Sequence, residues 1–118
     1  MIGKGACRLP QAFWLKIGAL EGKCMVEKVG SLIDPSDCLG SPLIMAVDTY
    51  VENDKVRVYP IDSCLVAPFG RRLYDYEIPA TSAPDLYFNL YNNIWNTNFP
   101  LWYSDDTRYR FRIENISL

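Results

Sequence analysis

The sequence feature that most constrains the fold is a series of short strand-like runs separated by turn residues. The run 108–113 alternates strictly between arginine and an apolar or aromatic residue, which is the period of a strand with one wet and one dry face. No segment repeats its apolar residues with a helical period. Eight or nine such runs joined by Gly, Pro and Asn turns predict an all-β fold, an antiparallel β-sandwich of about eight or nine short strands. The runs lie at 12–17, 23–29, 43–52, 56–61, 62–66, 73–78, 87–91 and 108–113.

Local signals refine this pattern. The runs 43–52 and 56–61 form the clearest hairpin, because the intervening Asn and Asp tolerate the positive φ of a tight turn. Pro60 lacks an N–H group for a ladder and predicts an edge position or a strand end. Residues 30–42 contain two Pro, two Gly and three Ser. They predict a loop in which Asp34 accepts hydrogen bonds from nearby backbone N–H groups.

Size and charge limit the functional classes. At 118 residues, 49% hydrophobic and 22% charged, the chain has the composition of one globular domain spanning 1–118, with 1–11 as a ragged start. The formal net charge of −2 gives no reason to expect a nucleic-acid partner or an acidic membrane surface. No apolar run approaches the roughly 18 residues that cross a bilayer. The N-terminus lacks a signal-peptide pattern. The compartment stays open, with a cytoplasmic location as the favoured alternative.

Histidine and cysteine usage restricts the chemistry further. The chain has no His, which removes Ser–His and Cys–His nucleophilic pairs and His-based zinc sites. The four Cys form no CxxC motif, so the sequence indicates neither a zinc ribbon nor a thioredoxin-type pair. They are interpreted as small buried hydrophobic residues, with one or two disulfides as the alternative. These residues are Cys7, Cys24, Cys38 and Cys64.

The segment 87–113 concentrates aromatic and amide side chains. It contains nine of the sixteen aromatic residues, two of the three Trp and five Asn. Such rings and amides suit a sugar platform or a contact with another protein surface. In the alternative interpretation, the amides satisfy buried loop groups and the rings fill one end of the core. The candidate contact residues are Tyr91, Asn92, Asn93, Trp95, Asn96, Asn98 and Trp102.

Other charged residues could also carry chemistry. Paired carboxylates can act in glycoside hydrolysis when they flank a sugar. Adjacent strand residues point to opposite faces, so Asp105 and Asp106 predict a turn cap, and Asp34 with Asp37 predicts a loop turn. Asp48 and Asp62 could meet across a sheet. The three arginines of 108–113 could bind an anion, or could form a solvated face paired with Asp75, Glu77 or Glu114.

The segment FNLYNNIWNTNFPLWYSDDTRYRFRI resembles the closing segment of glycoside hydrolase family 38-like, or α-mannosidase-like, proteins, whose pattern is roughly FNLYNNxWGTNFPxW followed by FRF. The upstream pieces RLPQAFWLKI, IDPSD and IDSCLVAPFG occur in the same order as in that family. Asn96 stands where the family has Gly, and Asn is the non-Gly residue that best tolerates positive φ. The IDSCLV piece departs from the family's D-A-P-L-V, which puts any family role of Asp62 in doubt.

The resemblance implies a C-terminal β-sandwich that lies behind a catalytic domain. In that family the divalent metal, held by His and Asp, and the carboxylate nucleophile belong to an N-terminal barrel. A chain without His cannot supply that metal set, so no cofactor and no catalytic residue are expected in this chain. The expected partner is the catalytic domain of the same parent protein, together with the carbohydrate in the cleft that the domain helps to shape.

Three functional hypotheses follow. The first is an accessory domain whose 92–102 loop packs on the catalytic domain and leaves an exposed apolar patch when the domain is isolated. The second is a stand-alone carbohydrate-binding module, which requires ring faces open to solvent. The third is a purely structural domain, in which the Asn amides satisfy buried partners. An independent small enzyme is the least favoured alternative, because no residue spacing points to a site.

Overall fold

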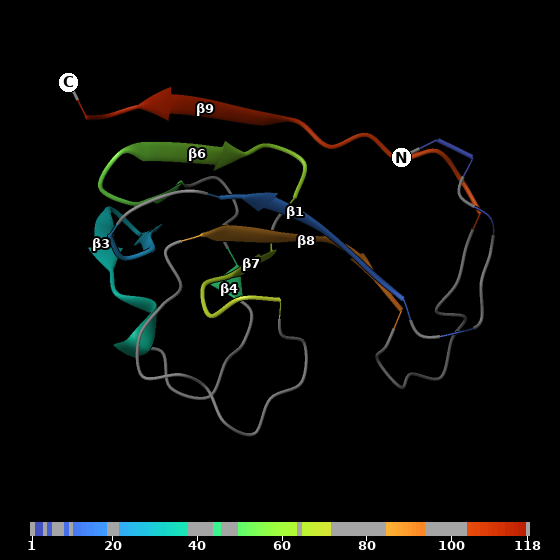
Figure 1. Cartoon of the computed structure of the whole chain (residues 1–118), viewed down its shortest axis with the longest axis horizontal. Helices are drawn as coiled ribbons and strands as arrows, with labels where there is room; N and C mark the ends of the chain where they lie inside the picture. Colours follow the sequence, from blue (N-terminus) through green and yellow to red (C-terminus); the bar gives the residue numbers. More distant parts are fainter. Residues whose placement is uncertain are drawn as a thin grey trace.

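The computed structural model describes residues 2, 3, 5, 9, 11–18, 22–37, 44–45, 50–63, 65–71, 85–93 and 104–117. These residues form two antiparallel sheets that pack face to face, as Figure 1 shows, so the predicted all-β sandwich is confirmed. The predicted strand at 73–78 lies outside the described residues. In the part of the chain that is described, no helix is both long and apolar enough to span a membrane.

The first sheet has five strands in the order β3-β2-β5-β6-β9. Their bounds are β3 Ser31–Ile33, β2 Met25–Lys28, β5 Val51–Glu52, β6 Val56–Pro60 and β9 Phe111–Asn115. Alternation decides which side chains of β2 enter the core. Val26 is fully buried, and Cys24 just before the strand is buried with it, whereas Met25 and Glu27 occupy the other face.

The turn between β5 and β6 is held by the side chain of Asn53. Its Oδ1 accepts hydrogen bonds from the Lys55 and Val56 N–H groups at 3.0 and 2.9 Å. The predicted hairpin is therefore confirmed, but the expected positive φ is not. Among the described non-glycine residues, positive φ occurs at Val29 alone, in the β2–β3 turn. The Asn side chain replaces the backbone bond that a tighter turn would provide.

The second sheet has four strands in the order β1-β8-β7-β4. Their bounds are β1 Ala12–Ile17, β8 Leu86–Asn92, β7 Leu65–Ala67 and β4 Ile44–Met45. The run 43–52, expected as one hairpin arm, is thus divided between the two sheets. Its first part pairs with β7 in this sheet, and its last two residues pair with β2 and β6 in the other.

The core lies between the two sheets. Each fully buried aliphatic or aromatic side chain there contributes about 1.5–3 kcal/mol of transfer free energy. The rings of Phe88 and Phe111, one from each sheet, lie 5.0 Å apart between centroids. The core cluster consists of Cys24, Val26, Val51 and Val58 on the side of the first sheet and Val66, Leu86 and Phe88 from the second.

A β-bulge interrupts the pairing of β1 with β8. Phe13 lies opposite Tyr91, but the next residue, Trp14, lies opposite Asn89, so β8 contains one extra residue. As a result, Tyr91 shares a face with Phe88 although three positions separate them. Simple period-2 alternation through 87–91 does not anticipate this shift.

One local prediction needs correction. The expected loop 30–42 contains strand β3 and a short 3₁₀ helix, Pro35–Asp37 (η1). The predicted turn at Asp34 is present, since its Oδ1 accepts a hydrogen bond from the Ser36 N–H at 2.9 Å. Pro60 ends β6, which confirms the second of its two predicted positions, and β6 itself lies between β5 and β9.

Candidate contact surface at the end of β8

The buried amide of Asn93 joins the end of β8 to the chain that precedes β1. Only 6% of Asn93 is exposed. Its Nδ2 donates to the Leu9 C=O at 3.0 Å, and its Oδ1 accepts from the Gln11 N–H at 2.5 Å. Its backbone N–H also donates to the Gln11 C=O at 3.0 Å. Residues of the expected ragged start are therefore held in place by one of the predicted contact residues.

Two further amides stabilise the bulge. Asn89 is buried, and its Nδ2 contacts the Tyr91 and Phe13 carbonyl oxygens at 3.4 and 3.5 Å. Its Oδ1 accepts a hydrogen bond from Asn92 Nδ2 at 2.7 Å. Both side chains thus satisfy groups where the ladder is disrupted. Asn89 was not among the predicted contact residues. Its role depends on the bulge, which the sequence pattern does not indicate.

The ring of Tyr91 faces the interior. Tyr91 is 8% exposed and packs against Phe13 with the ring centroids 5.9 Å apart and the planes tilted by 39°. Phe13 is the more accessible of the two rings, with 38% of its surface exposed. Of these two described rings, the accessible one therefore belongs to β1.

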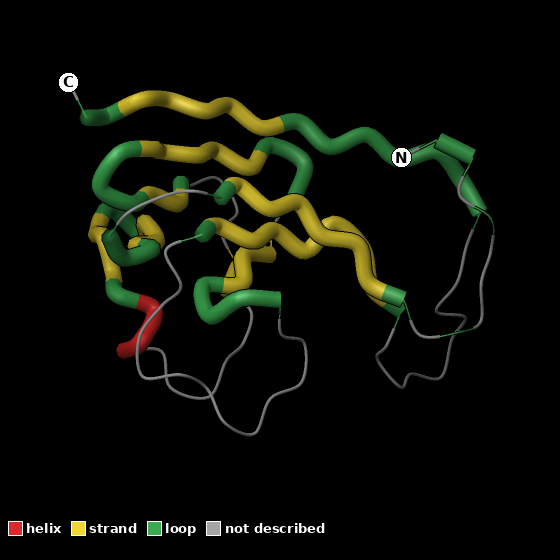
Figure 2. The backbone as a smooth tube through the Cα atoms, in the orientation of Figure 1, coloured by secondary structure: helices red, strands yellow, loops and turns green. Residues whose placement is uncertain are grey.

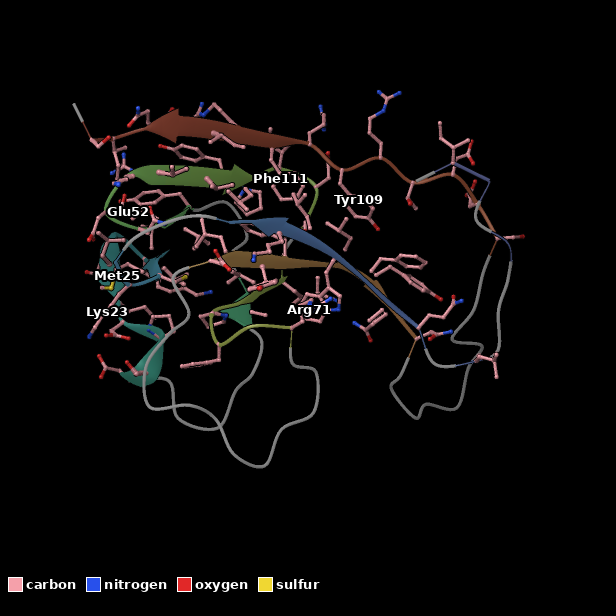
Figure 3. The ribbon with its side chains drawn as sticks, viewed as in Figure 1. Lys23, Met25, Glu52, Arg71, Tyr109 and Phe111 are labelled. Carbon is pink, nitrogen blue, oxygen red and sulfur yellow. The ribbon has the colours of Figure 1, made fainter. Side chains whose placement is uncertain are left out.

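The segment 104–110 returns past this same end before it enters β9, as Figure 2 shows. The Tyr109 hydroxyl donates to the Leu90 C=O at 2.5 Å, and Figure 3 shows its ring directed from this segment toward the second sheet. The Gly3 N–H donates to Asp106 Oδ1 at 2.6 Å. A cavity of about 470 Å³ lies beside this segment. Its described lining residues are Ile2, Asp106, Thr107, Arg108 and Tyr109.

The arginine side chains of 108–113 make different contacts at different positions. Arg110 binds Asp62 in bidentate fashion, with Nε–Oδ2 and Nη2–Oδ1 distances of 2.8 Å. Its hydrogen bonds hold the pKa of Asp62 below the ordinary value. Arg112 stacks on the Tyr59 ring at 3.9 Å and lies 3.2 Å from Glu114, one of its predicted partners. The interpretation as a solvated, paired face therefore holds for these two arginines, although Asp62 was not predicted as a partner.

Asp34 and Asp105, two of the candidate carboxylates, bind groups within the domain. Asp34 is hydrogen bonded by Ser36 and by Lys23 Nζ, and these bonds lower its pKa to about 2, with the Ser36 hydroxyl as the largest cause. Asp105 Oδ1 accepts from the Asp106 N–H at 2.7 Å, but Asp105 lies in an isolated β-bridge and not in the predicted turn. Within the described ranges, no group of three Cys, Asp or Glu side chains could hold a metal ion.

Exposed apolar side chains lie around the start of β1 and the end of β8. Ile2 is 89% exposed and lines the cavity beside Tyr109. Leu9 is 72% exposed, and its backbone is bound by Asn93. Together with Phe13, they give this end of the described structure an apolar character that burial in the domain's own core does not explain.

Several predicted residues cannot be placed. Trp95, Asn96, Asn98 and Trp102 lie outside the described residues, as do Cys7, Cys38 and Cys64. Cys24 is a buried thiol, in agreement with its interpretation as a small hydrophobic residue. Burial raises the pKa of this thiol to about 12.

Comparisons of the chain with protein-family models, with curated proteins and with solved structures gave no match. A functional proposal for this chain therefore rests on the fold, on the geometry at the end of β8 and on the resemblance of its sequence to the family named above.

Proposed function

We propose that this chain is a non-catalytic accessory domain of a glycoside-hydrolase-like, α-mannosidase-like protein. Its partner is the catalytic domain of the same parent protein, which supplies the divalent metal and the nucleophile. The observation that carries the proposal is the set of exposed apolar side chains at the end of β8, where the segment resembling that family leaves the sheet. An exposed apolar group rimmed by fixed polar residues is typical of a protein contact surface.

The amide network supports a contact surface more than a sugar platform. Asn93 and Tyr91 are almost fully buried, and the amides of Asn89, Asn92 and Asn93 bind groups within the domain. Asn89 and Asn93 fix the backbone at the end of β8, which forms the base of the proposed contact. Asn92 Nδ2 binds the Asn89 side chain, and Asn92 Oδ1 is buried without a partner and so is not open to a sugar. Polar groups already paired within a fold have little capacity left for sugar hydroxyls. We propose that 92–102, held on this base, packs on the catalytic domain and helps to shape its carbohydrate cleft.

The first test reads the coding frame around this chain for an α/β barrel and expresses that barrel separately. Isothermal titration should then show saturable binding between the two polypeptides. Leu9→Asp and Phe13→Asp should weaken binding, because each places a charge in a surface that must lose water. Val29→Asp is the matched control, since Val29 is fully exposed in the β2–β3 turn and its positive φ suits Asp. The proposal fails if no barrel is encoded in frame, or if all three variants bind equally.

The alternative, a stand-alone carbohydrate-binding module, is tested by Trp fluorescence. Titration of the chain alone with mannose- and glucose-based oligosaccharides should leave the emission unchanged if the surface contacts protein. A saturable change would instead favour the carbohydrate-binding module, with Phe13 as an accessible ring that can be tested by substitution with Ala.

A further inference from the structure

Strand β9 is the outermost strand of the five-stranded sheet and lies at the top of Figure 1. Its pairing with β6 uses alternate residues, as the bond from the Ile116 N–H to the Lys55 C=O at 2.8 Å shows. In an antiparallel pair, the intervening residues direct their N–H and C=O groups to the opposite side. On β9 the residues that present their backbone groups to this outer edge are Phe111, Ile113 and Asn115.

The other edges of the two described sheets are blunted. Strand β4 has two residues and β3 has three, which leaves little backbone for a partner. Strand β1 carries a bulged pairing and the exposed Lys16. Short strands, bulges and edge lysines are the usual devices that prevent edge-to-edge association. Strand β9 has five residues in regular register and no lysine, and its two charged residues, Arg112 and Glu114, are of opposite sign.

The face of β9 that points toward the core also remains incompletely covered. Ile113 lies directly opposite Val58, so the two side chains share the inner face of the sheet. Val58 is fully buried, whereas 57% of Ile113 is exposed. A strand added beyond β9 would extend the sheet and cover this side chain.

The charges of β9 complement a second copy of the same strand. When two copies run antiparallel with Ile113 opposite Ile113, Arg112 of each lies opposite Glu114 of the other. In this arrangement Phe111 of each copy lies opposite Asn115 of the other, so their outward-directed N–H and C=O groups can form hydrogen bonds. Arg112 is already held on the outer face of the sheet by its stacking on Tyr59 at 3.9 Å. Opposite charges directly across a strand pair stabilise that pairing.

We propose that this chain forms a symmetric dimer through β9, in which the two five-stranded sheets join edge to edge about Ile113. The two-fold axis passes between the two copies of Ile113, so the same patch serves both partners. The surface at the end of β8 belongs to the other sheet, so this association is separate from the proposed docking on a catalytic domain.

Sedimentation equilibrium of the full chain tests the proposal. The mean mass should rise with concentration toward twice that of one chain. Ile113→Lys should give a monomer at every concentration, because an inward-pointing charge at an edge opposes pairing. Leu32→Lys is the matched control, since Leu32 is 42% exposed on β3 at the opposite edge of the same sheet. Circular dichroism checks that both variants retain the wild-type fold.

Charge reversal tests the register. Arg112→Glu and Glu114→Arg should each raise the dimer dissociation constant about tenfold, because like charges then oppose each other at both symmetry-related positions. Mixing the two variants should restore association, since each supplies the charge that the other lacks. A monomeric wild-type chain overturns the proposal. So does a dimer that Ile113→Lys leaves intact, or a mixture that associates no better than either variant alone.

Discussion

Replacing Asn93 with alanine removes two side-chain hydrogen bonds that hold the segment before β1 against β8. The Leu9 C=O loses its donor at 3.0 Å, and the Gln11 N–H loses its acceptor at 2.5 Å. Because Asn93 is 6% exposed, water has little access to either group. Leaving a buried donor or acceptor unsatisfied costs about 1–3 kcal/mol. Both bonds are only partly buried, so we expect about 1 kcal/mol for each and a total loss near 2 kcal/mol.

Urea denaturation of wild type and variant measures this loss directly. The midpoint should fall while the slope with urea stays constant, which shows that stability has changed and not the compactness of either state. For a chain of this size, about 2 kcal/mol corresponds to a decrease in Tm of roughly 6–12 °C. The Asn93→Asp variant separates the two bonds, because a carboxylate retains the acceptor for Gln11 but places a negative charge against the Leu9 C=O.

Asn115 offers a matched control for this experiment. Its Oδ1 also accepts two hydrogen bonds, from the N–H and the hydroxyl of Ser117, but the residue is exposed. Asn115→Ala should therefore change the free energy of unfolding by less than about 0.5 kcal/mol. Equal effects of the two substitutions would refute the reasoning that burial of the Asn93 amide makes it structural.

Three further expectations concern a core ring and two titratable side chains. Phe88→Ala, which empties a fully buried site between the sheets, should lower the free energy of unfolding by about 3–5 kcal/mol in urea titrations. The folded pKa of Asp34 is depressed to about 2, so its contribution is present above the unfolded value and lost as the pH falls toward 2. The difference in stability between wild type and Asp34→Asn should therefore shrink over that acid range. The Cys24 thiol should react with maleimide far more slowly in the folded than in the unfolded chain, as mapped by mass spectrometry, since burial disfavours the thiolate.

Much of the fold could be predicted because local and global preferences agree in most strands. The predicted run 23–29 contains β2; Cys24 and Val26 alternate there with Met25 and Glu27, and the side of Cys24 and Val26 is buried. The division of 43–52 between two sheets could not be predicted in the same way. Apolar composition favours a strand, but the choice between two partner sheets depends on contacts with β7 and β2, which are distant in sequence.

The candidate site was harder to predict for a related reason. Asn89 and Asn93 acquire their roles from a bulge and from a chain segment some eighty positions away, and neither feature has a local signature. The Asp62–Arg110 pair has the same origin, because its two residues meet only after β6 and β9 align. Composition could indicate that the 87–113 segment is unusual, but only the register shows which amides are engaged within the domain.

The two proposed surfaces can be tested against each other because they belong to different sheets. Docking on a catalytic domain uses the end of the β1–β8 pair, whereas self-association uses the outer edge of β9. Arg112→Glu should therefore raise the dimer dissociation constant about tenfold without weakening binding to the separately expressed barrel, and Phe13→Asp should weaken binding to the barrel without changing dimerisation. Independent sites that share no partners behave additively, so the double variant should show both losses and no more. If one substitution impaired both assays, the two surfaces would have to be coupled through the sandwich, and the separate assignments would fail together.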